Sequence, residues 1–191
     1  MIDKIIDLIN GQFDGIREDE IILGIAQQVY RSKQDGVVEY MPGILNLGTD
    51  EVIYAGIDDI NSIMIYHKVN SSNLTFVNPQ AGSGYGDGRR NEDSILCSVI
   101  TVWDTRKVKI HSPDMLLLIR SRMPQVILDV PNINSVTITA NNALLNTQQV
   151  FQSEYKLEEN YLLPHYFKML QLNYTIQLRY DPECIEKCID C

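Results

Sequence analysis

A glycine-rich stretch is the first feature of this sequence whose residue types could do chemistry. It consists of Gly82, Gly84, Gly86, Gly88, Arg89 and Arg90. A phosphate-binding loop needs a Gly-Lys-Ser/Thr run that opens a helix, and a dinucleotide-binding fingerprint needs its last glycine at a helix start. Here the glycines lead towards a predicted strand. We therefore interpret them as part of a long exposed loop, residues 70–93, and not as a nucleotide site.

The same loop is suited to reaching a neighbouring subunit, because glycine permits conformations that become ordered only on contact. Tyr85 is then its candidate anchor, and Arg89 and Arg90 are candidate ionic partners. These three residues form the predicted inter-subunit contact.

Three of the four cysteines, Cys184, Cys188 and Cys191, lie close together. Their spacing is similar to the cluster-binding run of radical enzymes that cleave S-adenosylmethionine, but those enzymes follow it with a large barrel that has no counterpart here. As a zinc site the run offers three thiolates on one helical face, and folding would have to bring His165 or Cys97 as the fourth ligand. We therefore predict no metal and no cofactor, and expect free thiols in a reducing cytosol.

The three histidines, His67, His111 and His165, share no motif with a serine or a carboxylate. No nucleophile elbow or metalloprotease helix surrounds any of them. A triad assembled only by tertiary folding is the alternative, and a structural histidine at each place is the favoured interpretation. The chain is predicted not to be an enzyme and to have no catalytic residue.

Length and composition set the class of protein that must position these residues. The chain has 191 residues, of which 45% are hydrophobic and 21% charged, as expected of one globular domain. The longest apolar run, residues 115–119, is too short to span a bilayer. Asp3 and Asp7 interrupt the opening segment, so we expect no signal peptide and an intracellular protein.

The formal net charge is −9, with acidic residues spread along the chain. This balance argues against a protein that grips nucleic acid by its phosphates, which needs a basic face. The simplest interpretation is solubility. The sharper alternative is an acidic surface past which DNA moves without sticking.

Two helices are predicted from apolar spacing and end signals. Residues 2–9 place isoleucines on one helical face, with a glycine two positions later as a stop. The second helix is predicted to begin with Ser112 as its cap, Pro113 in the first turn and Asp114 at the positive end of the dipole. Pro124 ends it, and its apolar residues predict packing on a sheet.

Several strands are predicted from runs of apolar or alternating residues. They are residues 20–31 and 37–45 as a hairpin, then 51–57, 62–69, 94–103, 136–140 and 170–180. The pattern of residues 20–31 also fits a helix, and the turn signal that follows them favours the hairpin. The run 94–103 is apolar on both faces, which indicates a central strand. The run 170–180 alternates apolar and polar residues without a break, which predicts a half-buried strand with one open face.

This order of elements predicts one α+β domain over residues 1–180, in which an antiparallel or mixed sheet packs against a few helices. A Cys-containing C-terminal tail, residues 181–191, follows it. Residues 141–160 are polar and predict no clear element.

Taken as a whole, the order of elements resembles that of the tail-terminator-like and neck ring proteins of tailed bacteriophages, including those of crAss-like phages. The likeness spans about residues 1–180. The segments that carry it are IDKIIDLIN, VEYMPGIL, NSIMIYHKV, SILCSVITVWD, SPDMLLLIRSRM and PHYFKMLQLNYTIQLRY.

This resemblance implies a tail-terminator-like fold and a structural virion protein. Six or twelve copies would form a ring in the neck or tail, next to the portal and other ring proteins, around a channel through which genomic DNA passes without specific binding. Assembly would take place in the host bacterial cytoplasm, with no membrane involved. The glycine-rich loop and the cysteine run do not belong to the shared pattern. The alternative is an intracellular binding or adaptor domain, with zinc held by the C-terminal cysteines.

Overall fold

The computed structural model describes residues 2–13, 21–25, 27–32, 38–46, 51–54, 63–77, 90–127, 133, 135–154 and 165–180. Within them lie three helices: α1 (Ile2–Gly11), α2 (Ser112–Arg122) and α3 (Thr147–Glu154). The strands are β1 (Ile21–Ile25), β2 (Gln27–Ser32), β3 (Val38–Asn46), β4 (Glu51–Tyr54), β5 (Ile63–Val77), β6 (Arg90–Asp104), β7 (Val126–Ile127), β8 (Ser135–Leu144) and β9 (Phe167–Tyr180).

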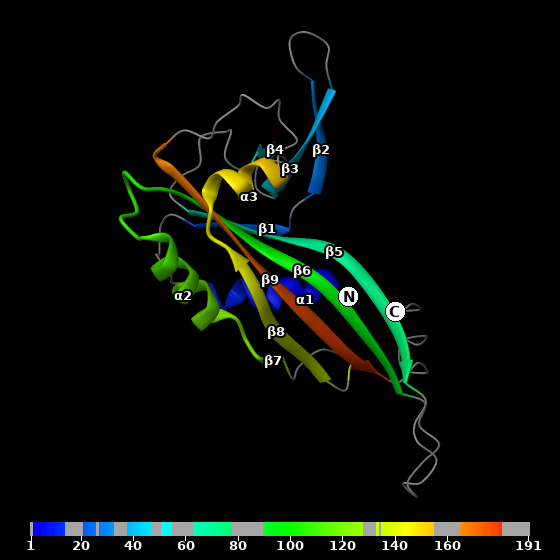
Figure 1. Cartoon of the computed structure of the whole chain (residues 1–191). Helices are drawn as coiled ribbons and strands as arrows, with labels where there is room; N and C mark the ends of the chain where they lie inside the picture. The colour runs from blue at the N-terminus through cyan, green and yellow to red at the C-terminus, as the bar shows by residue number, and fades with distance from the viewer. Residues whose placement is uncertain are drawn as a thin grey trace, which may run out of the picture.

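A six-stranded sheet in the order β1-β5-β6-β9-β8-β7 organises the fold (Figure 1). Every neighbouring pair from β5 to β7 is antiparallel, and β1 joins β5 in parallel. A smaller antiparallel sheet has the order β2-β3-β4. The predicted class, a single α+β domain in which an antiparallel or mixed sheet packs against a few helices, is confirmed, and the large sheet is mixed.

The predicted hairpin forms from β2 and β3, whereas Ile21–Ile25 joins the large sheet as β1. The predicted central strand is also confirmed, because β6 lies between β5 and β9. In β9, Leu170, Leu172 and Tyr174 are buried while the residues between them are partly exposed, which confirms the period of two.

The predicted long loop at 70–93 is wrong at both ends. Residues 70–77 belong to β5 and residues 90–93 to β6, and the two strands stay in register as far as Val77 opposite Arg90. The ladder of backbone hydrogen bonds does not depend on apolar side chains, and β9 continues the pairing on the other edge of β6 as far as Asn91. Serines and asparagines therefore continue a polar hairpin here, and residues 78–89 lie outside the described part.

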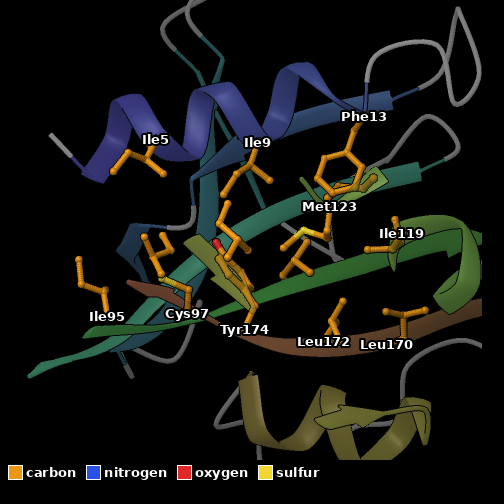
Figure 2. Packing of buried hydrophobic residues seen from close by; sticks show 14 of the residues in the cluster. Ile5, Ile9, Phe13, Ile95, Cys97, Ile119, Met123, Leu170, Leu172 and Tyr174 are labelled. Carbon is orange, nitrogen blue, oxygen red and sulfur yellow. The ribbon is translucent and has the colours of Figure 1, made fainter. Parts of the chain in front are cut away.

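The two faces of the large sheet have different covers. On the inner face, α1 and α2 pack against the sheet through a core that includes Ile5, Ile9, Ile119, Leu172 and Tyr174 (Figure 2). Burial of apolar surface in such a core is the main favourable contribution to the free energy of folding. On the outer face lies α3, whose Val150 and Phe151 are buried. It contacts β9 and β8 at one end of the sheet.

Both predicted helices are present, and α2 differs from the prediction in two details. Its N-cap position is His111, without a side-chain cap, so Ser112 is the first helical residue and not the cap. Pro113 has no N–H group, which removes one of the donors that a cap would satisfy. Met115 and Ile119 are buried, but Leu117 is 64% exposed, so only one side of this apolar helix packs.

The polar segment after β8 forms α3 because its N-terminal end is anchored. The side chain of Asn146 accepts a hydrogen bond from the backbone N–H of Gln149 at 3.1 Å, as an N-cap does. The hydroxyl oxygen of Thr147 accepts from the backbone N–H of Met169 at 3.2 Å, which ties the helix to β9. Among the helices described, none is long and apolar enough to cross a membrane.

Candidate interaction surface on the outer face

A row of uncharged polar side chains crosses four neighbouring strands on the outer face. The Ser98 hydroxyl on β6 lies at its centre. It accepts from Asn70 Nδ2 of β5 at 2.6 Å and donates to Asn173 Oδ1 of β9 at 2.7 Å. Asn173 Nδ2 in turn donates to Asn142 Oδ1 of β8 at 3.0 Å. We call Asn70, Ser98, Asn173 and Asn142 the amide row.

Gln171 reinforces the amide row from the next outward-facing position of β9. Its Nε2 donates to Ser98 Oγ at 3.1 Å and to Asn173 Oδ1 at 2.8 Å. Ser98 is fully buried and Asn173 and Gln171 are half-buried, so these bonds form in a partly desolvated setting where losing one is costly.

Two β-bulges position Asn70 and Asn142, the residues at the two ends of the amide row. In β5 the register shifts between Val69 and Ser71, which leaves Asn70 as the extra residue. In β8 it shifts between Ala140 and Ala143, so that Asn141 and Asn142 lie opposite one residue of β9. A bulge re-aims a side chain and bends its strand. Here two bulges at the same level of the sheet each turn an asparagine towards the Ser98–Asn173 pair.

The bulge in β8 is supported from the other side of the sheet. Arg120, near the end of α2, donates from Nη2 to the backbone oxygen of Asn141 at 3.0 Å. The Asn141 side chain donates to Thr175 Oγ1 at 2.9 Å. A bulge leaves backbone groups without partners in the strand ladder. The bonds from Arg120 and to Thr175 give Asn141, a residue of the β8 bulge, hydrogen-bond partners.

The chemistry of this surface is suited to hydrogen-bonded contact. Amides and hydroxyls both donate and accept hydrogen bonds, but none of them titrates near neutral pH. Thr139, Asn141, Asn142 and Gln177 are exposed on or beside the amide row, so a partner can reach it. Protein interfaces contain direct hydrogen bonds and few charged residues at their core, and the exposed neutral polar groups here are able to form such bonds.

A second polar cluster lies buried on the inner face. His67 Nδ1 and the Tyr174 hydroxyl are hydrogen-bonded at 2.8 Å, and the same hydroxyl is bonded to the Cys97 thiol. The rings of His67 and Tyr174 meet edge to face, and Phe13 of α1 lies 6.0 Å from the His67 ring. All four side chains have no exposed surface.

Burial changes the acid–base properties of this cluster. It lowers the pKa of His67 to about 3 and raises the pKa of Cys97 to about 11, because charged forms are poorly solvated there. It also raises the pKa of Tyr174, and the neighbouring thiol adds to the effect. A neutral imidazole, thiol and phenol are thus buried together under α1. Only one ring nitrogen is satisfied, since Nε2 has no partner among the described residues.

The remaining predicted residues are dispersed. Tyr85 and Arg89 lie outside the described residues, as do Cys184, Cys188 and Cys191. Arg90 is the first residue of β6, and its side chain is outside the described part.

The candidate fourth zinc ligands are also apart. Cys97 is buried opposite Tyr174, whereas His165 is exposed before β9 begins. Nine residue steps of nearly continuous strand lead from His165 to Tyr174, a distance of about 30 Å. In the described part of the chain no three His, Cys, Asp or Glu side chains are grouped as metal ligands.

Sequence patterns reveal one of the four residues of the amide row. The alternation in β9 indicates that Gln171, Asn173 and Thr175 share an open face. The bulges that recruit Asn70 and Asn142 depend on register between strands far apart in sequence, which a single sequence does not show. The adjacent asparagines Asn141 and Asn142, directly after the predicted strand 136–140, are the signal that the sequence offers.

Comparison with known proteins adds no identification. No protein-family model matches the sequence, and no curated protein matches it.

Proposed function

We propose that this chain is a structural subunit that assembles with copies of itself into a ring in the neck or tail of a tailed bacteriophage. The ring connects the portal to the tail, next to other neck and tail ring proteins, and encloses the DNA channel. The amide row on the outer face is the observation that carries the proposal. Its placement by two bulges supplies an ordered contact surface, and α3 covers one end of that face.

The lateral edges of the large sheet favour assembly in which subunits contact through their surfaces and not by pairing the edge strands of two subunits. β1 and β5 form one edge and β8 and β7 the other, so the two sides of a subunit differ. Contact between unlike patches is the geometry that generates rings. Both outer long strands carry a bulge, a common device against edge-to-edge pairing.

The neutral character of the amide row also agrees with a channel that does not retain DNA. Binding to the phosphate backbone requires lysine and arginine side chains that release counterions. Amides and hydroxyls provide none of this attraction. A surface of this kind suits a subunit in a conduit whether it faces a neighbour or the channel.

Charge placed beside the amide row tests the proposal. The double variant Thr139→Arg/Gln177→Arg puts two like charges on exposed outer-face positions, where a contact would have to desolvate them. We expect its ring population, measured by native mass spectrometry, to fall about tenfold or more, equivalent to ~1.4 kcal/mol. Gln12→Arg/Ser121→Arg is the matched control, with the same added charge at exposed positions of the α1 end and of α2.

Equal assembly of both variants would show that this face is not a contact. A wild-type chain that stays monomeric at every concentration would remove the proposed ring itself.

A further inference from the structure

One corner of the fold collects exposed basic side chains. It consists of residues 105–111, which connect β6 to α2, and residues 165–168, which lead into β9. The backbone N–H and the hydroxyl of Thr105 both donate to the carbonyl oxygen of Tyr166, each at 2.7 Å, and hold the two segments together. The exposed basic residues are Arg106, Lys107, Lys109 and Lys168. Neither segment contains an acidic residue. We call these two segments the basic corner.

The carboxylate beside the basic corner, that of Asp104, is hydrogen-bonded to Arg106. Asp104 is buried and pairs with Arg106, with Nη2 and Oδ2 2.6 Å apart, and this hydrogen bond lowers the pKa of Asp104. The Arg106 guanidinium also lies over the Tyr166 ring, 3.8 Å from its centroid. Asp104 therefore orders Arg106, and its carboxylate also attracts Lys107.

Lys109 lies on one segment of the basic corner and Lys168 on the other. Trp103 pairs with Lys168 across β6 and β9. The indole N–H of Trp103 donates to the carbonyl oxygen of Ile110, the residue after Lys109, at 3.3 Å. Trp103 thus links the strand position of Lys168 to the residue that follows Lys109.

The tail after β9 has the opposite charge. Residues 181–191 carry Asp181, Glu183, Glu186 and Asp190 against Lys187 alone. Four carboxylates and one ammonium make this tail complementary to the basic corner.

The first acidic residues of the tail lie too far along the chain from the basic corner to reach it in their own copy. β9 runs from the corner along the whole sheet (Figure 1), so Lys168 and Tyr180 lie about 40 Å apart along the strand. From Tyr180, a fully extended chain carries Glu183 at most ~11 Å and Glu186 at most ~22 Å. These two glutamates cannot contact Lys168 in the same copy, and a second copy placed end to end presents its corner to them.

We infer that the basic corner is the docking site for the acidic tail, residues 181–190, of a second copy of this chain. This inference rests on the proposed function and names one contact of that assembly. The contact joins unlike ends of two copies, so each copy both donates a tail and receives one. Contacts of this kind close into rings or extend into stacks.

A charge exchange between two full-length variants tests this contact. The corner variant is Lys109→Glu/Lys168→Glu, and the tail variant is Glu183→Lys/Glu186→Lys. Each alone places like charges together, so we expect self-association to weaken about tenfold or more at low salt, measured by analytical ultracentrifugation. An equimolar mixture restores both contacts, because each variant's tail matches the other's corner, and assembly should return to the wild-type level. Lys4→Glu/Arg122→Glu, at exposed positions on α1 and α2, is the control of equal charge and should assemble normally.

A mixture that stays dissociated overturns the inference. In that case the corner binds another partner, such as a segment of its own chain or a nucleic acid, and a gel-shift measurement with duplex DNA separates these two. Unchanged assembly of the corner variant overturns it as well, while leaving the ring intact. A monomeric wild-type chain contradicts the proposed function instead.

Discussion

Ser98 and Asn173 face each other across β6 and β9, and the Ser98 hydroxyl donates to Asn173 Oδ1 at 2.7 Å. This pair lies between two bulges, one in β5 and one in β8, each of which supplies an asparagine to it. The polar face of the sheet is thus an ordered hydrogen-bonded layer, and its order depends on one buried hydroxyl.

Removing that hydroxyl should destabilise the fold. Ser98→Ala leaves the donors of Asn70 and Gln171 and the acceptor of Asn173 without their central partner. We expect the free energy of unfolding to fall by about 1–3 kcal/mol, measured by urea denaturation. Ser94→Ala, a half-buried position on the same strand outside the amide row, should change it by less than ~0.5 kcal/mol. Equal values for the two variants would show that the row contributes nothing to stability.

The buried hydroxyl of Tyr174 should matter in the same way on the inner face. Tyr174→Phe keeps the ring but removes the group that bonds to both His67 and Cys97, at an expected cost of about 1–3 kcal/mol in thermal or urea unfolding. Tyr166→Phe makes the same change at a half-buried ring and serves as the control. A neutral effect of Tyr174→Phe would contradict the structural role of this cluster.

His67 predicts how stability depends on pH. Its pKa is about 3 in the folded chain and about 6.5 when unfolded, so between these values the unfolded chain binds a proton that the folded chain does not. The stability that neutral His67 provides is fully present above about pH 6.5 and is lost as the pH falls towards 3, by about 1.4 kcal/mol per pH unit. His67→Phe should remove this part of the slope in urea titrations at several pH values. An unchanged slope would mean that His67 is not buried in its neutral form.

Cys97 should be protected from thiol reagents. Its side chain is fully buried and its pKa is raised to about 11, so the reactive thiolate is scarce at neutral pH. Mass spectrometry after iodoacetamide treatment should find residue 97 unmodified in the native protein and modified in urea. Rapid labelling of the native protein would place this thiol at the surface.

The one-sided packing of α2 gives a matched pair of substitutions. Ile119→Ala empties a buried position and should cost about 2–5 kcal/mol. Leu117→Ala, at an exposed position two residues earlier, should cost less than ~0.5 kcal/mol because helix propensity and contacts barely change. Both values come from urea unfolding, and similar costs would mean that both sides of α2 are packed.

Much of the fold follows from sequence because local patterns determine it. The isoleucine spacing of α1, the proline that ends α2 and the alternation of β9 each reflect one element and its own burial. The length of the β5–β6 hairpin does not follow, because Ser71 and Asn73 are held in the strand by pairing with β6 and not by their own preference. The amide row has the same origin, since Asn70 and Asn142 meet Ser98 and Asn173 only through register across the whole sheet.

The size of the particle that the purified chain forms tests the central claim most directly. Negative-stain electron microscopy combined with native mass spectrometry should show closed annuli with one fixed number of subunits, because unlike contact surfaces on a rigid fold set a single rotation between neighbours. Compact single particles with the mass of one chain, over the whole accessible concentration range, would contradict it.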